Sequence, residues 1–279
     1  MQQLRHLADS PPDSPIVPHQ RARGLARVGF GPEGRLTALR QQGSGKVMLP
    51  RTHGAMPEAV FVNTCGGVTG GDRFRWELSV GQGASATGTT QAAERLYCAS
   101  GGRGRIETVL SAAAGATLHW LPMETILFEH CAVDRRIEID LSGDATFLGV
   151  EALVLGRAAM GETLTHAHFA DHWRIRRDGK LVQAEAFRLS GDLHEVLSGP
   201  ATLRDIRAVA TIILSAPDAA DRLEPLRARL PQTVACGASA WNGQLIVRLH
   251  AADHRPLKAA LIEILTWLRG APLPRVWNM

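Results

Sequence analysis

Three similar stretches of the chain decide the fold: residues 77–87 read E-L-S-V-G-Q-G-A-S-A-T, residues 107–118 read E-T-V-L-S-A-A-A-G-A-T-L and residues 138–148 read E-I-D-L-S-G-D-A-T-F-L. Each has the pattern of a strand, a tight turn at glycine and a second strand. They recur at intervals of about 30 residues, a period typical of proteins whose repeats stack as a solenoid. The sequence therefore predicts a mainly β fold with β-helix-like stacked strands.

The segments before the repeat extend this prediction. The sequence A-R-G-L-A-R-V-G-F at residues 22–30 and R-L-T-A-L-R at residues 35–40 flank a Gly-Pro-Glu-Gly turn, which is the pattern of a β-hairpin. Residues 1–18 hold four prolines among polar residues and are expected to form a loose N-terminal tail.

The chain changes character after the repeat. Apolar strands are expected at residues 208–215 and 244–250, with a helix at 217–230 between them. A second helix begins at Asp253 and places leucines at helical spacing as far as Gly270, its C-cap. This predicts a small C-terminal strand–helix–strand–helix portion with two α-helices. We expect one domain over residues 19–279, divided into a β-rich body (19–205) and an α/β C-terminal portion (206–279).

Composition argues against several classes of partner. The formal net charge is only +4, with 31 lysines and arginines against 27 acidic residues, and no basic stripe suggests nucleic acid. The most apolar stretch, from Ala208, is shorter than the roughly 20 residues that span a bilayer, and the N-terminus lacks a signal peptide's apolar region. Four scattered cysteines favour reduced thiols. We therefore expect a cytoplasmic protein that binds neither nucleic acid nor membrane.

One polar residue follows the glycine turn in each repeat: Gln91, Glu124 and Glu151. All three lie in otherwise apolar segments, and stacking of the repeats would bring them near one another. Buried carboxylates are costly unless they are paired or hydrated. They can therefore mark a functional interior, or they can be rim residues or ion-pair partners of Arg95 and Arg157.

The glycine-rich stretch V-N-T-C-G-G-V-T-G-G-D-R-F at residues 62–74 resembles a phosphate-binding loop only superficially. A P-loop requires lysine after its last glycine, whereas Asp72 stands here and would repel phosphate. G-Q-G-A-S-A at residues 81–86 fits a loose dinucleotide fingerprint, but a threonine-rich segment follows where a helix is required. We expect Asp72 to bond turn amides, and the glycines to permit sharp turns and close strand approach. These structural glycines are Gly66, Gly67, Gly70 and Gly71.

The sequence H-A-H-F-A-D-H at residues 166–172 is the densest group of metal-binding residue types. On a strand, His166, His168 and His172 would share one face and could bind zinc or nickel. Exposed loop histidines are the simpler interpretation, because these histidines do not follow the helical E-x-x-H motif of zinc hydrolases. The chain also lacks a G-x-S-x-G nucleophile elbow. The residues therefore predict that the protein is not an enzyme, and a metal-dependent enzyme built on these histidines is a minor alternative.

Five motifs in order closely resemble the urease accessory protein UreD, or UreH, family, and the match runs from about Arg23 to the C-terminus. The resemblance implies a non-enzymatic maturation factor that binds UreF, UreG and apo-urease and helps to place nickel in the urease active site. In this family UreG is the GTPase. The resemblance also implies a β-rich fold with helix-like winding and two α-helices. The motifs are N-T-C-G-G-V-T-G-G-D (63–72), T-T-Q-A-A (89–93), L-P-M-E-T-I-L-F (121–128), E-A-L-V-L-G-R-A-A-M-G-E (151–162) and P-L-P-R-V-W (272–277).

Under this resemblance, a carboxylate-lined interior path would carry nickel transiently, without a tightly bound cofactor. Its expected residues are Gln91, Glu124 and Glu151, together with Asp72 and Glu162. Arg157 and Arg275 are expected to hold these carboxylates. The alternative is a pure docking adaptor that nickel never enters. Two features depart from the family pattern: Cys65 replaces a small residue, and Glu94 precedes Arg95 where a basic residue is usual.

Overall fold

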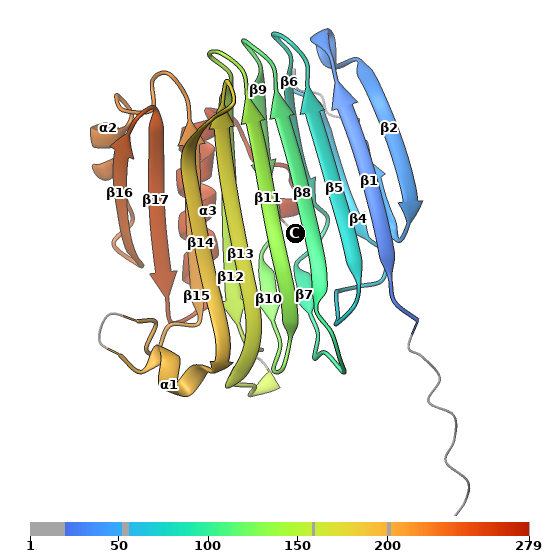
Figure 1. Cartoon of the computed structure of the whole chain (residues 1–279). Coiled ribbons are helices and arrows are strands. Elements are labelled where there is room, and N and C mark those ends of the chain that lie inside the picture. Colours follow the sequence, from blue (N-terminus) through green and yellow to red (C-terminus); the bar gives the residue numbers. More distant parts are fainter. Residues whose placement is uncertain (1–19, 52–55, 158–159, 200–201, 279) are drawn as a thin grey trace, which may run out of the picture.

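The computed structural model describes residues 20–51, 56–157, 160–199 and 202–278, so the expected N-terminal tail lies outside the described residues. The strands form two facing layers (Figure 1). In hydrogen-bonding order, the front layer contains β2 (Leu36–Gly43), β1 (Arg23–Phe30), β5 (Arg73–Val80), β8 (Gly104–Ala112), β11 (Ala132–Leu141), β13 (His166–Arg177) and β14 (Lys180–Asp192).

The back layer lies behind the front layer, and its strands follow one another in the same direction, from the N-terminal to the C-terminal side of the stack. It contains β3 (Gly45–Met48), β4 (Glu58–Asn63), β6 (Ser85–Thr90), β9 (Thr117–Leu121), β12 (Thr146–Leu155), β15 (Ala208–Ser215), β17 (Gln244–Ala251) and β16 (Ala235–Trp241). Two short strands, β7 (Glu94–Leu96) and β10 (Thr125–Leu127), pair with each other, and β10 also pairs with β12.

The three repeats form successive coils, which confirms the mainly β, β-helix-like fold. Strands β5, β8 and β11 are parallel neighbours, and so are β6, β9 and β12. This register aligns Leu78, Leu110 and Ile139, all fully buried between the layers. Each tight turn is also fastened by a following segment: Asp144 accepts the Gly115 amide at 2.7 Å, and Asp178 accepts the Gly143 amide at 2.9 Å.

The helices lie at the C-terminal side of the stack. α3 (His254–Arg269) packs against β12, β15 and β17 on the outer side of the back layer. Its buried leucines form a second core there, because they recur on one helix face. Asp253 caps its first turn and Gly270, with φ 65°, ends it. No helix in the described ranges is long and apolar enough to cross a membrane.

The expected hairpin at the N-terminal side is confirmed by β1, a short 3₁₀ turn (Pro32–Gly34) and β2. The C-terminal portion contains an additional strand, β16, which the sequence analysis did not predict, and α2 (Leu223–Arg227) is shorter than expected. A third helix, α1 (Leu193–Leu197), follows β14 and is capped by Asp192. The two helices are too short for a clear hydrophobic period, and β16 consists mostly of alanine, glycine and serine, which have low strand propensity.

Candidate functional site

Three charged residues occupy positions that should be apolar. The residues of β11, β12 and β13 that face the other layer are mostly large and hydrophobic, because successive side chains of a strand alternate between its two faces. Arg135, Glu151 and Asp171 break this pattern, one on each strand. Their exposed fractions are 8%, 7% and 4%, so the three charges lie inside the protein.

Arg135 is the centre of this group. Its Nε and Nη2 donate to the two carboxylate oxygens of Asp171, both at 2.9 Å, and its Nη1 donates to Thr125 Oγ1 at 3.0 Å. The Trp173 indole also donates to Asp171, at 3.0 Å. The planar guanidinium is therefore committed to Asp171 in a bidentate arrangement.

Glu151 has fewer polar contacts than Asp171. Its Oε2 lies 2.8 Å from Arg135 Nη2, and the same nitrogen also donates to Asp171. Burial raises the pKa of Glu151 to about 7, the Arg135 charge opposes this, and the nearby Asp171 raises it further. A buried carboxylate that shares its cation with a second carboxylate destabilises a protein when it ionises, so its presence suggests that function requires it.

A further carboxylate, Glu94, lies beside this group. In the short parallel strands, Glu94 is opposite Thr125, and Thr125 is opposite Leu153, two residues beyond Glu151. Burial raises the pKa of Glu94 to about 7, against the effects of the Asn63 hydrogen bond and the Arg135 charge. Asn63 Nδ2 donates to it at 3.1 Å.

Two cavities adjoin the charged group. One, of about 170 Å³, is lined by Asn63, Gln91 and Glu94 together with apolar residues of β4 and β5. The other, of about 80 Å³, is lined by Glu151 and Asp171 and by Glu185 and Arg248, which form an ion pair at 2.8 Å. Both volumes can hold water, since one water needs about 10–15 Å³. One cavity therefore adjoins Glu151 and Asp171 and the other adjoins Glu94, and both are large enough for water.

The structure does not bring all five expected path residues together. Glu151 lines one cavity and Gln91, which is exposed, lines the other. Glu124 faces α3, with Oε2 3.7 Å from His254 Nε2 and 4.0 Å from Lys258 Nζ. The reason is strand alternation: the next residue, Thr125, points inward to Arg135, so Glu124 points outward. The structure therefore does not gather Gln91, Glu124 and Glu151 at one place: Glu124 faces α3, and Gln91 and Glu151 line different cavities.

Asp72 and Glu162 are engaged elsewhere. The buried carboxylate of Asp72 accepts the amides of Ala22, at 2.8 Å, and Thr69, at 2.9 Å, as expected for a residue that holds its turn. Glu162 forms an ion pair with Arg157, as predicted for that arginine. Arg157 also lies over the Phe128 ring, with its guanidinium carbon 4.3 Å from the ring centroid.

Arg275 does not hold a carboxylate. It is exposed and makes no ion pair with the residues that the structure describes. By contrast, the four glycines of the 62–74 stretch occupy demanding positions. Gly66 and Gly71 have φ values of 76° and 89°, while a Cβ on Gly67 would lie 2.3 Å from the Tyr97 ring and one on Gly70 would lie 2.4 Å from the Gly101 carbonyl oxygen.

The sequence analysis missed Arg135 and Asp171 and did not assign Glu94 to the path. One available signal was parity on β13: Asp171 alternates with the apolar residues Phe169 and Trp173, whereas the histidines of that stretch occupy the other face. A charged residue at an inward position of a strand is a reason to search for a buried partner.

The three histidines of residues 166–172 lie on a strand and not in a loop, on the outer face of β13. They do not gather into one site. His168 Nε2 lies 3.0 Å from Asp134, His172 is exposed, and His166 is grouped instead with Glu129 and His130. The surface site expected from these three histidines together is therefore not formed.

Comparison with known proteins agrees with the motifs and the fold. The family model described as "UreD urease accessory protein" matches residues 22–278. Among similar proteins, "Urease accessory protein UreD" of Jannaschia sp. (strain CCS1) is 46% identical over 267 residues, covering 96% of this chain and 99% of the relative. The protein of the same description from Xanthobacter autotrophicus is 48% identical over 262 residues, covering 92% and 90%. This chain belongs to the UreD family of urease accessory proteins.

Proposed function

We propose that this protein helps to insert nickel into apo-urease, and that the metal passes between the two layers along Gln91, Glu94, Glu151 and Asp171. A role in urease maturation follows from the family. The observation that carries the proposed path is Glu151, a buried carboxylate that lines a cavity and shares its cation, Arg135 at 2.8 Å, with Asp171.

The charge of the buried group supports a divalent cation. Glu94, Glu151 and Asp171 surround one guanidinium, that of Arg135, so their full ionisation leaves two negative charges uncompensated. Without a metal, burial raises the pKa of both Glu94 and Glu151 to about 7, so both carboxyl groups keep their protons below about pH 7. A passing Ni²⁺ would displace those protons and balance the charge.

The residue types suit passage better than storage. Carboxylate and amide oxygens are harder ligands than the imidazole and thiolate groups that hold nickel firmly, so a metal on them exchanges readily. The path proposed from the structure keeps Gln91 and Glu151 from the sequence-based hypothesis and adds Glu94 and Asp171. Glu124, Asp72 and Glu162 line neither cavity and are not part of it.

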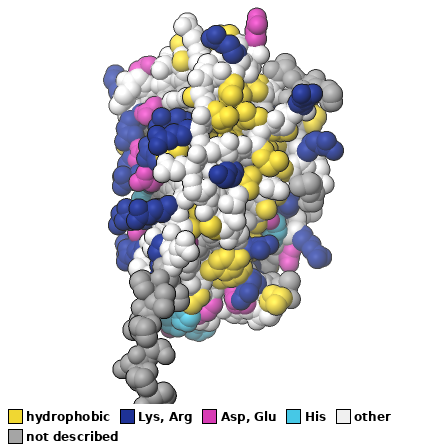
Figure 2. All heavy atoms as spheres, turned by 90° about the vertical axis from the view of Figure 1, so that its right-hand side faces the viewer, with side chains coloured by type: hydrophobic (Ala, Val, Ile, Leu, Met, Phe, Trp, Pro, Cys, Tyr) yellow, Lys and Arg dark blue, Asp and Glu magenta, His cyan; other side chains and the backbone are white. Residues whose placement is uncertain are grey.

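Docking to partner proteins forms the second part of this proposal: UreF, UreG and apo-urease are the proposed partners, in the cytoplasm, with no enzymatic step on this chain. The end of the stack formed by β1–β3 offers a suitable surface, with apolar side chains between flanking lysines and arginines (Figure 2). Strand β2 has exposed side chains along almost its whole length. Exposed apolar residues at this end are Leu36, Leu39, Met48 and Leu49.

The test is complementation of a urease operon from which its own UreD gene has been deleted. Urease activity and nickel per active site are measured with the wild-type chain and with Glu94→Gln, Glu151→Gln and the double variant. We expect the wild type to restore activity and the double variant to lose most of it, while still being recovered with its partner proteins. Glu107→Gln is the matched control, because Glu107 lies on the outer surface beside Arg75.

The same experiment separates the path from the adaptor alternative. If the double variant assembles and activates urease as well as the wild type, nickel does not use these carboxylates and the protein serves as a docking adaptor. If the wild-type chain neither restores activity nor recovers partner proteins, the proposed function itself is wrong.

A further inference from the structure

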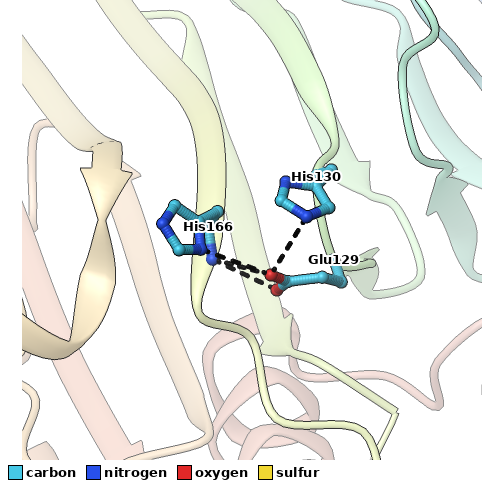
Figure 3. A group of neighbouring side chains, drawn as sticks. All are labelled: Glu129, His130 and His166. Carbon is cyan, nitrogen blue, oxygen red and sulfur yellow. Dashed lines mark hydrogen bonds and ion pairs between the residues drawn. The ribbon is translucent and has the colours of Figure 1, made fainter.

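A second group of metal-binding residue types lies outside the interior path. It consists of Glu129 and His130, in the turn between β10 and β11, and His166, the first residue of β13 (Figure 3). One ligand atom from each residue lies within 4.8 Å of the others. The side chains of His130 and His166 are 61% and 50% exposed, so the group is open to solvent.

The backbone holds these residues next to each other. The His130 amide donates to the His166 carbonyl at 2.8 Å, and the His166 amide donates to both Glu129 carboxylate oxygens at 3.1 Å. His130 adopts φ 58°, an uncommon left-handed conformation for a residue with a side chain. That turn directs its imidazole toward Glu129, with Nε2 3.6 Å from Oε1, and the two imidazole rings stack with centroids 5.4 Å apart.

The carboxylate of Glu129 is fixed in place by its neighbours. It accepts the Thr165 amide at 2.6 Å and the Thr165 hydroxyl at 2.5 Å, and the His166 amide donates to both of its oxygens, so a bound metal would replace one of these donors, such as the Thr165 hydroxyl.

The spacing matches that of metal ligands. With metal–ligand bonds of about 2.1 Å, ligands in a tetrahedral site lie about 3.4 Å apart. His130 Nε2 and His166 Nδ1 each lie 3.6 Å from Glu129 Oε1, and both rings are exposed and can adjust. In the present arrangement His166 Nδ1 also lies 3.1 Å from the Thr165 hydroxyl, which a metal would replace as its partner.

We propose that Glu129, His130 and His166 form a surface site for a divalent transition metal such as Ni²⁺ or Zn²⁺. Two imidazoles and one carboxylate are a ligand set that both metals accept. Three protein ligands leave at least one coordination position open to water or to a ligand from another protein, so the site can receive and release metal. This inference does not depend on the interior path, because none of its three residues lines either cavity.

Direct binding tests the proposal. The purified full chain, without a histidine tag, is titrated with NiCl₂ by calorimetry, and bound nickel is counted after equilibrium dialysis. His130→Asn removes the imidazole while keeping a residue that tolerates the left-handed backbone, and His166→Gln removes the second imidazole. Each change is expected to weaken this binding event at least about tenfold, since loss of outer-shell partners alone commonly costs 10–100-fold. The double variant should bind one nickel fewer than the wild type.

Two controls make the result specific. His172→Gln removes an exposed histidine of the same strand that is not in the group, and it should leave nickel binding unchanged. Glu151→Gln should likewise preserve the binding that the double variant loses, which separates this site from the interior path. Equal nickel affinity and stoichiometry in the wild type and the double variant would overturn the proposal. So would an equal loss with His172→Gln, which would indicate non-specific binding to exposed imidazoles.

Discussion

Glu151→Gln should stabilise the protein at alkaline pH while impairing its function. Glutamine has nearly the same shape as glutamate but no charge to bury beside Arg135 and Asp171. Burial raises the pKa of Glu151 from 4.5 to about 7. A group with a raised folded-state pKa binds its proton more tightly in the folded protein, so its stabilising effect is complete below pH 4.5 and is lost as the pH rises to about 7.

The magnitude follows from the size of the pKa shift. One pKa unit corresponds to about 1.4 kcal/mol, so the ionised Glu151 side chain destabilises the fold by about 3 kcal/mol at pH 8. Glu151→Gln removes this penalty, and for a chain of this size the change corresponds to a rise in melting temperature of several degrees. At pH 4.5 the side chain is protonated in the folded protein, and the two proteins should differ little.

Urea unfolding, followed by circular dichroism at pH 5 and pH 8, measures this difference. The free energy of unfolding of Glu151→Gln should exceed that of the wild type at pH 8 and approach it at pH 5. A variant that unfolds more easily than the wild type at pH 8 would refute the reasoning, because it would show that ionised Glu151 and Arg135 stabilise the fold as a pair.

Further substitutions test other parts of the structure. Arg135→Met leaves Asp171 buried without its cation and should cost about 3–5 kcal/mol in urea unfolding; unchanged stability would contradict the buried pairing. Gly70→Ala places a Cβ 2.4 Å from the Gly101 carbonyl oxygen and should lower the melting temperature or the soluble yield, whereas a normal melting curve would argue against the close approach. Leu39→Arg, at an exposed position of β2, should leave the melting temperature unchanged but reduce recovery of partner proteins in pull-down; undiminished recovery would exclude this end as the docking surface.

The stacked architecture could be predicted because each coil is encoded by a short, continuous stretch of sequence. Each repeat contains its own strand, glycine turn and second strand, and parallel stacking preserves the repeat period in the sequence. The long β1–β2 hairpin was predictable for the same reason. In contrast, β16 consists mostly of small residues with low strand propensity, and α1 has only five residues, so tertiary contacts determine both elements.

Both sites needed information that a single sequence lacks. Arg135 and Asp171 meet because β11 and β13 pair in one particular register, which places Arg135 opposite Asp171 across 36 residues of sequence. Likewise, His130 reaches His166 through a left-handed turn at a residue that seldom adopts that conformation. The sequence showed Glu151 as an unusual carboxylate, but which partner it would face depended on the alternation of neighbouring strands.

The aspartates that accept hydrogen bonds from the glycine turns determine from which end the stacked coils should unfold. Asp144 secures the turn of the coil before it, and Asp178, in the turn of the β13–β14 hairpin, secures the turn that contains Gly143. Each coil therefore depends on its successor, as in a chain of nearest-neighbour units. Opening of the β13–β14 hairpin would release the Gly143 turn first, and the earlier turns would open one after another. Local unfolding should therefore travel from this hairpin toward the N-terminus.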